Sequence, residues 1–257
     1  MGLEMISLKS PREIEAMRRA GRLTAQARAL AGSMIRPGVT THEIDTAVRR
    51  FIESHGAKPS FLGYGGFPGS ACISVNEEVI HGIPGPRKLK EGDIVSVDVG
   101  AFIGGFHGDC AATYPCGQVS DEAKRLIQVT QQSFWEGIKH ALPGKRISDI
   151  SRGVQTYVEA NGFSVVREYV GHGVGAQMHE APEVPNYVMT RRLGGDPRLV
   201  KNMTIAVEPM VNAGTVHIRQ LPDGWTVKTA DGKYAAHYEN TILITDGEPE
   251  ILTQCGD

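Results

Sequence analysis

The two halves of this chain repeat one pattern of residues. At an offset of 106 residues, and without any gap, Pro37-Gly38 falls on Pro143-Gly144. After this turn both copies carry apolar residues at the i, i+4, i+7 and i+8 spacing of one helix face, and both end at a glycine, a common residue just past a helix end. A further helical segment precedes each copy, at 13–33 and 121–142, so each half is predicted to begin with two helices. The matched pairs are Ile44 and Ile150, Val48 and Val154, Phe51 and Tyr157, Glu53 and Glu159, and Gly56 and Gly162.

Strand-like segments follow the helices in each half. They are rich in Val, Ile and Gly and contain runs that alternate with period two. Residues 93–98 (DIVSVD) align with 203–208 (MTIAVE), and residues 106–113 (FHGDCAAT) align with 236–243 (AHYENTIL). One such match could arise by chance between short hydrophobic strands. Three matches in the same order, two of which pair acid with acid, favour a duplication.

The duplication predicts an α+β fold within one domain that spans residues 1–257. We expect a repeat of about residues 10–117 and 120–247, in which helix-helix-strand units form a curved antiparallel sheet. The helices should pack on the outer face of that sheet, because each element must bury its apolar side against another.

Two acidic residues of each half lie inside the predicted strands. Asp98 and Asp109 belong to SVDVGAFIGGFHGDC (96–110), which has the pattern of a buried hairpin, and the repeat matches them with Glu208 and Glu239. Side chains two residues apart share one face of a strand, and the neighbours of the acids on that face are small enough to leave room. Burying each unpaired charge costs several kcal/mol, and clustered carboxylates raise one another's pKa. Two divalent cations, rather than one, would neutralise four acids.

A hydrolytic site with two metals also needs histidine among its ligands. His172 and His179 lie in the glycine-rich segment GHGVGAQMHE, whose glycines permit close approach of the backbone, and His81 lies in VIHGIPG. These three are the candidates for function. The expected surface histidines, which lie on or next to predicted helices, are His42, His55 and His140.

Composition excludes several other classes of protein. A net charge of −2 and a pI near 6.5 give no reason to expect a nucleic-acid partner or an anionic membrane surface. No apolar run approaches the ~20 residues that cross a bilayer, and the N-terminus does not resemble a signal peptide. The cysteines show no C-x-x-C spacing, which favours free thiols in the cytoplasm; they are Cys72, Cys110, Cys116 and Cys255.

Taken together, these segments resemble the type I methionine aminopeptidases, whose duplicated fold is known as the pita-bread fold. The resemblance extends from about Ile6 to Thr253, and only 28 residues separate His179 from Glu208, which leaves no room for the helical insertion of type II enzymes. It rests on GYGGFPGSACISVNEEVIHGIPG (63–85), SVDVG (96–100), GFHGDCAATYPCG (105–117), GHGVGAQMHEAP (171–182), TIAVEPMV (204–211) and HYENTILIT (237–245).

The resemblance implies a role for each candidate residue. Two divalent ions (Co, Mn, Fe or Zn) would be held by Asp98, Asp109, His172, Glu208 and Glu239, with Asp109 and Glu239 bridging the ions. His81 and His179 would face the substrate, and Glu208 would act as the general base. The residues expected to line the methionine pocket are Tyr64, Phe67, Cys72 and Trp225, whereas Phe61 and Met178 replace the cysteine and phenylalanine of well-known bacterial relatives.

The implied activity is the removal of the N-terminal initiator methionine from nascent proteins and peptides that have a small second residue. A water that bridges the two metals would attack the first peptide bond. We expect a monomer in the cytoplasm, associated with the ribosome, within a single catalytic domain. Two alternatives stay open: a proline-specific aminopeptidase or dipeptidase of the same fold, and an inactive module of this fold that binds protein partners.

Overall fold

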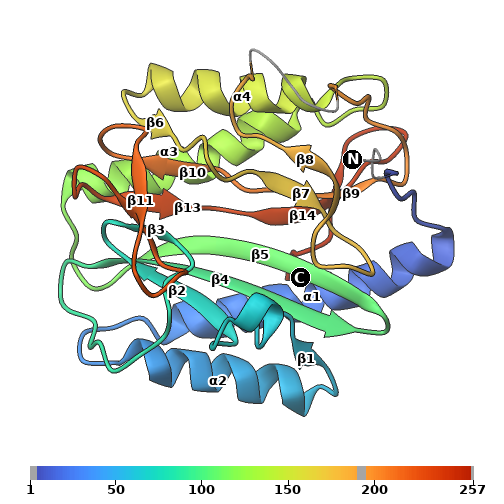
Figure 1. The fold of residues 1–257 in the computed structure, drawn as a ribbon. Coiled ribbons are helices and arrows are strands. Elements are labelled where there is room, and N and C mark those ends of the chain that lie inside the picture. The colour runs from blue at the N-terminus through green and yellow to red at the C-terminus, as the bar shows by residue number, and fades with distance from the viewer. Residues whose placement is uncertain (1–4, 190–194, 256–257) are drawn as a thin grey trace.

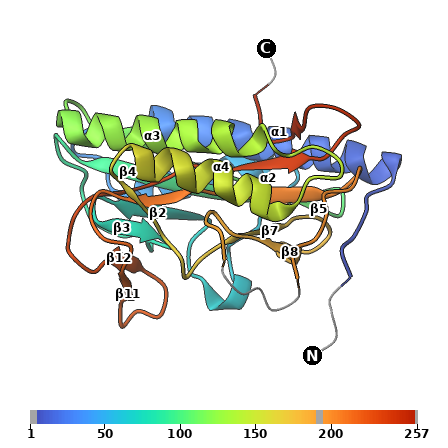
Figure 2. The same ribbon diagram turned by 90° about the horizontal axis from the view of Figure 1, so that it is seen from above.

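In the described part of the chain, four helices form one layer and the strands form the other. The computed structural model describes residues 5–189 and 195–255. In Figure 1 the helices of the first half, α1 (Pro11–Ser33) and α2 (Thr41–Ser54), lie below the strands, and α3 (Asp121–Ile138) and α4 (Ile147–Ala160) lie above them. The view from above shows all four helices on one side of the strand layer (Figure 2). The expected α+β architecture is confirmed.

The strands of both halves pair antiparallel in four sheets. One sheet has the order β1-β4-β2 with β5 also on β4, and another has the order β15-β14-β9-β7-β8. The two smaller sheets are β13-β10-β6 and β11-β12-β3, and the latter joins the halves. The first half contains β1 (Lys58–Pro59), the 3-10 turn η1 (Tyr64–Gly66), β2 (Ala71–Val75), β3 (Glu78–Ile80), β4 (Ile94–Ile103) and β5 (Phe106–Pro115). The second contains β6 (Ser164–Val165), β7 (Gly171–Gly173), β8 (Glu180–Val184), β9 (Thr204–Val207), β10 (Met210–Asn212), β11 (Ile218–Gln220), β12 (Val227–Thr229), β13 (Ala235–His237), β14 (Asn240–Leu243) and β15 (Glu250–Ile251).

Capping residues mark the start of the first two helices. Ser10 and Glu13 form a capping box at α1, and Thr40 and Glu43 form another at α2, so that backbone N–H groups left free at the helix start are satisfied. The apolar stripes predicted for α2 and α4 are largely buried. The third helix is shorter than predicted, because it ends at Ile138 rather than at residue 142. The proline at 143 disfavours helical backbone at the residue before it.

The predicted acidic hairpin is formed by β4 and β5. Gly104 and Gly105 at its turn both have positive φ, 65° and 88°, which suits the tight turns that match strand twist. The register pairs Asp98 with Ala111 and Gly100 with Asp109. Asp98 and Asp109 are therefore diagonal neighbours on one face of the hairpin, as alternation predicts.

The last predicted strand, 236–243, is divided in the structure. Its start belongs to β13, which pairs with β10, and its end belongs to β14, which pairs with β9 and β15. Residues 238 and 239, between β13 and β14, belong to neither strand, because Glu239 pairs instead with Ala111 of the first half. This pair exchanges two backbone hydrogen bonds, Glu239 N–H to Ala111 O at 2.9 Å and Ala111 N–H to Glu239 O at 3.2 Å.

Threonine side chains continue this contact between the halves on both sides of the Ala111–Glu239 pair. Thr113 Oγ1 accepts from the N–H of His237 at 2.9 Å and donates to its carbonyl at 2.9 Å. Thr241 Oγ1 makes the equivalent pair of bonds to Asp109, at 3.2 and 2.8 Å. We call this contact the seam; it consists of residues 109, 111 and 113 of β5 and residues 237, 239 and 241.

The core lies between the helix layer and the strands. The first half buries α1 and α2 against β2 and β4, through residues such as Ile44, Val48, Ile73 and Val97. The second half has corresponding clusters beneath α3 and α4. Across residues 5–189 and 195–255, no helix is both long and apolar enough to cross a membrane. All four cysteines are free thiols.

Candidate metal centre and substrate cavity

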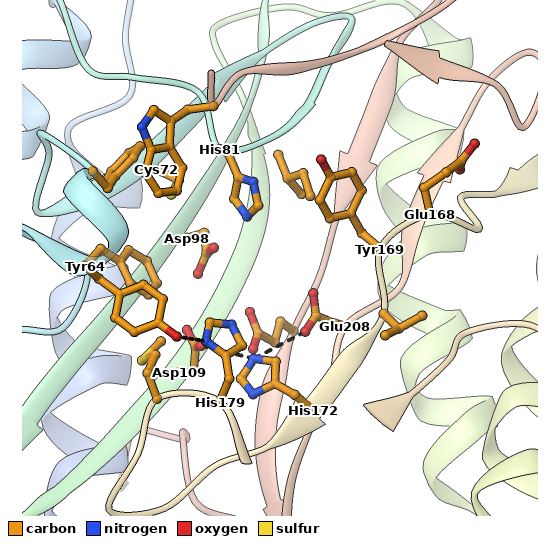
Figure 3. A pocket seen from close by; sticks show the side chains of 17 residues that line it. Tyr64, Cys72, His81, Asp98, Asp109, Glu168, Tyr169, His172, His179 and Glu208 are labelled. Carbon is orange, nitrogen blue, oxygen red and sulfur yellow. Dashed lines mark hydrogen bonds and ion pairs between the residues drawn. The ribbon is translucent and has the colours of Figure 1, made fainter. Parts of the chain in front are cut away.

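One cavity of about 290 Å³ contains every candidate site residue named from the sequence. Figure 3 shows how the carboxylates and histidines face one another across it. The five predicted ligands on its wall are Asp98, Asp109, His172, Glu208 and Glu239. It is also lined by the two predicted substrate-facing histidines, His81 and His179, and by the predicted pocket residues Tyr64, Phe67, Cys72 and Trp225.

The carboxylates reach this cavity from both halves of the chain. Asp98 and Asp109 come from β4 and β5, Glu208 follows β9 directly, and Glu239 lies in the seam. His172 comes from β7, with its Nε2 atom 3.7 Å from Asp109 Oδ2 and 3.6 Å from Glu208 Oε1. The possible ligand atoms of Asp109, His172 and Glu239 all lie within 4.8 Å of one another.

The tautomer of His172 leaves the correct atom free to bind a metal. Its Nδ1 lies 2.8 Å from the carbonyl oxygen of Gly173, which can only accept, so Nδ1 carries the hydrogen. Burial lowers the pKa of His172 to about 3, and the ring is therefore neutral with a lone pair on Nε2. This backbone contact is the usual way in which a protein orients a histidine ligand.

Burial makes the charged form of each acid in the cluster unfavourable. It raises the pKa of Asp98 to about 7. Burial also raises the pKa of Asp109 well above its usual range, and the neighbouring Glu239, Asp98 and Glu208 raise it further. The pKa values of Glu208 and Glu239 rise for the same two reasons, burial first and nearby carboxylates second. Without a cation, these groups would hold protons in order to relieve the repulsion.

The unpartnered atoms of the cluster fit a metal site. Asp98 Oδ1, Asp109 Oδ1 and Glu239 Oε1 are buried and accept no hydrogen bond from the described residues. Buried polar atoms nearly always have a partner, so several such oxygens in one place fit a site that binds a cation. Carboxylates mixed with one imidazole are also a donor set that suits divalent first-row metals.

His81 and His179 lie at the edge of the cavity that faces the solvent. His81 directly follows β3 with φ of 58°, a backbone conformation that L-residues rarely adopt and that often marks functional sites. Its ring contacts Tyr169 and Trp225 edge-on, at centroid distances of 5.5 and 6.3 Å, and burial lowers its pKa to about 4. The ring of His179 lies against that of His172, with centroids 4.1 Å apart and the planes tilted by 48°. Both predicted histidines are thus next to the acidic cluster.

The remaining wall of the cavity is apolar. Phe61, Phe67, Cys72 and Met178 form a buried cluster against which Trp225 packs. Phe67 meets the indole edge-on at a centroid distance of 5.1 Å. Phe61 and Met178, the two departures noted in the sequence, therefore belong to this pocket.

Sequence reasoning missed several residues of the site. Glu168, Tyr169 and Val170 line the cavity, and Figure 3 shows the first two on the side opposite Tyr64. Their position just before GHGVG in the sequence is the signal that could have indicated them. His237, two residues before Glu239, is a further residue of the site. Its Nε2 lies 3.9 Å from both Glu208 and Glu239 and has no hydrogen-bond partner among the described residues.

The glycines around His172 permit close packing of backbones. A Cβ atom on Gly171 would lie 2.4 Å from the carbonyl oxygen of Ala206, and one on Gly173 would lie 2.4 Å from that of Ala181. The close approach that the sequence predicts here is therefore to the flanking strands β8 and β9. This close packing of the strands brings His172 within reach of Glu208, which follows β9.

Comparison with known proteins agrees with this geometry. A family model described as metallopeptidase family M24 matches residues 15–246. The chain belongs to this family. A methionine aminopeptidase of Clostridium perfringens is 53% identical over 249 residues, which cover 97% of this chain and 99% of the relative.

Solved structures extend the comparison to the fold. The crystal structure of methionine aminopeptidase from Rickettsia prowazekii matches with a TM-score of 0.93 and 40% identity, over 97% of this chain and all of that one. A prolidase from Pyrococcus furiosus matches with a TM-score of 0.79 but only 21% identity, over 97% of this chain and 66% of the prolidase. The prolidase shares the pita-bread fold. Within the family, the chain belongs with the methionine aminopeptidases.

Proposed function

We propose that this chain removes the N-terminal methionine from polypeptides. The observation that carries the proposal is that one cavity joins a group of carboxylates and histidine, suited to a metal, with an enclosed apolar pocket. Such a pocket fits one unbranched, polarizable side chain, and the thioether of Met178 and the thiol of Cys72 are themselves polarizable. Family membership adds that the chain is a metallopeptidase.

The metal would be held by the five residues proposed from the sequence. We propose that two divalent ions would be held here, with Asp98, Asp109, His172, Glu208 and Glu239 as their ligands. Four buried carboxylates call for more positive charge than one ion supplies. When bound, divalent ions lower the pKa of water and polarise the carbonyl group under attack.

Each side chain around the metals has a further proposed role in the reaction. Glu208 would take a proton from the attacking water and pass it to the leaving amine. His179 would donate a hydrogen bond to the carbonyl oxygen as negative charge develops there, and His81 would contact the scissile amide on its leaving side. Asp98 would help to hold the free α-amino group, which restricts cleavage to chain ends.

The apolar pocket would select methionine as the first residue. Phe61, Phe67, Cys72, Met178 and Trp225 enclose it, and binding there moves apolar surface out of water. We propose a preference for a small second residue, as the resemblance implies. Because Phe61 and Met178 differ from the residues of well-known bacterial relatives, the preference among inhibitors should differ as well.

Peptide hydrolysis tests this proposal against its nearest rival. The full chain, loaded separately with Co, Mn, Fe or Zn, should release methionine from Met-Ala-Ser and leave acetyl-Met-Ala-Ser intact. The variant Glu208→Gln is the matched control and should lose activity by orders of magnitude. Cleavage of Xaa-Pro peptides alone would instead support a proline-specific enzyme. A chain that binds none of these metals would be an inactive binding module.

Three wider features stay predictions. We propose that the two halves are a repeat within a single catalytic domain, on the basis of the aligned acids and the pair of helices that begins each half. A monomeric state can be measured by light scattering. Association with the ribosome and a location in the cytoplasm follow from the expected substrate, a nascent chain, and can be measured by co-sedimentation and fractionation.

A further inference from the structure

A hydrogen bond crosses the mouth of the cavity between Tyr64 and His179. The hydroxyl oxygen of Tyr64 lies 2.8 Å from Nδ1 of His179, and the ring centroids are 5.3 Å apart (Figure 3). Tyr64 belongs to η1 in the first half, whereas His179 lies just before β8 in the second. Within the described residues, this is the hydrogen bond that the structure gives to the Tyr64 hydroxyl. The contact is therefore specific to these two side chains.

The direction of this hydrogen bond decides the tautomer of His179. A neutral imidazole ring carries one hydrogen, on either Nδ1 or Nε2. If the phenol donates, Nδ1 is the acceptor and the hydrogen must be on Nε2. If Nδ1 donates, Nε2 has only a lone pair. A phenol is more acidic than a neutral imidazole, and an imidazole nitrogen is the better acceptor, so the phenol donates.

The tautomer matters because Nε2 is the nitrogen farther from the main chain. Figure 3 shows the ring of His179 projecting into the cavity between Tyr64 and His172. Only the tautomer with hydrogen on Nε2 can donate to an oxygen that becomes negative inside the cavity. The other tautomer would present a lone pair to that oxygen and repel it. In proteins the hydrogen bond made by one ring nitrogen commonly fixes the state of the other.

We propose that Tyr64 is a positioning residue for the reaction: its hydroxyl holds His179 in the Nε2–H tautomer and orients that N–H toward the scissile carbonyl. This assigns Tyr64 a role beyond lining the methionine pocket. The tautomer itself does not depend on the reaction, whereas its effect on the rate rests on the proposed aminopeptidase function. The two parts can therefore be tested separately.

The segment that carries Tyr64 is shaped to place this hydroxyl. Gly63, Gly65 and Gly66 all have positive φ, which allows η1 to make a single turn and return at once. Tyr64 is 46% exposed, so packing alone does not hold its ring. The hydrogen bond to His179 is consequently the contact that fixes the phenol across the cavity, and losing the hydroxyl should leave the ring of residue 64 less firmly held.

Nitrogen NMR measures the tautomer directly. Histidine labelled with 15N in the full chain gives different shifts for protonated and unprotonated ring nitrogens, and the zinc-loaded protein keeps the spectrum free of paramagnetic broadening. The variant His179→Gln assigns the signals. We expect Nδ1 of His179 to be unprotonated and Nε2 to be protonated in the wild type. The reverse pattern would overturn the proposal by itself, without any variant of Tyr64.

The variant Tyr64→Phe then tests the cause. It keeps the ring and removes the hydroxyl, so the shifts of His179 should move toward a mixture of tautomers. The matched control is Tyr169→Phe, which removes a phenol from the opposite wall, where the ring contacts His81 rather than His179. This control should leave the shifts of His179 unchanged. If Tyr64→Phe also leaves them unchanged, Tyr64 does not set the tautomer.

Kinetics separates positioning from pocket lining. A neutral hydrogen bond shifts an equilibrium by up to about tenfold, so Tyr64→Phe should lower kcat by roughly that factor and change KM little. A residue that only lines the pocket would raise KM and leave kcat. An unchanged kcat together with altered shifts would refute the link to the rate. Failure of the wild type to cleave methionine peptides would refute the proposed function and leave the tautomer result standing.

Discussion

Replacing Asp109 with asparagine should stabilise the metal-free protein. Asp109 is 4% exposed, its Oδ1 has no partner among the described residues, and burial and three neighbouring acids all disfavour its charge. An amide of the same shape carries no charge and can donate to an adjacent carboxylate. The substitution should therefore remove repulsion in the absence of metal and remove a ligand in its presence.

The size of the effect follows from the spacing of the cluster. Two full charges 4.8 Å apart, the largest separation of the ligand atoms of Asp109 and Glu239, repel by about 3.5 kcal/mol at an effective dielectric constant of about 20. Protons held by the acids relieve part of this, so we expect about 1–2 kcal/mol, or a rise in Tm of about 2–8 °C for a chain of this size. Metal at 100 times its Kd should stabilise the wild type by about 2.7 kcal/mol.

The order of stability should therefore reverse when metal is added. Scanning calorimetry of wild type and Asp109→Asn, in chelator and then in excess Mn or Zn, measures both states. The matched control is Asp93→Asn, because Asp93 is also buried but accepts hydrogen bonds from Asn76 and from the N–H of Lys90. Asp93→Asn should be less stable than the wild type both with and without metal. A metal-free Asp109→Asn that is less stable than the wild type would refute the repulsion argument.

Three further predictions concern pH, the pocket and the packing of the first helix. Because the pKa of Asp98 is raised from 3.8 to about 7, the metal-free protein should lose stability as pH rises from about 4 through 7; a flat urea-denaturation profile would contradict this. Phe67→Leu removes an edge-on aromatic contact, worth about 0.5–1.5 kcal/mol, and should raise KM for methionine peptides two- to tenfold with kcat kept. Gly21→Ala would place Cβ 2.2 Å from Leu252 O and should lower the free energy of unfolding, measured in urea, by about 1–3 kcal/mol or more. Gly85→Ala, with open space around it, should change that free energy little.

The acidic cluster could be predicted because the pattern that indicates it lies within short segments of the sequence and occurs in both halves. Alternation along a strand places Asp98 and Asp109 on one face of a hairpin, and the register observed in β4 and β5 confirms that placement. The repeat then supplies Glu208 and Glu239 without any knowledge of the tertiary fold. The helices were predictable for a similar reason, since their apolar stripes and caps lie within one segment.

Other parts of the site depend on which segments meet in space. The division of 236–243 into β13 and β14 follows from the seam, where Glu239 leaves its own ladder to pair with Ala111. No pattern within residues 236–243 indicates that the strand is divided. The bond between Tyr64 and His179 joins residues 115 positions apart, and the place of Tyr169 beside His81 likewise requires the folded chain.

The seam also determines when the metal site can form during folding. Its residues include Asp109 from one half and Glu239 from the other, and Arg28 of α1 donates Nη1 to the carbonyls of both Ala111 and Glu239. Any widening of the seam would separate the two acids. A chain cut between residues 117 and 120 should thus yield fragments that hold metal weakly alone and tightly once they reassociate. Affinity for metal would then report the docking of the halves during folding.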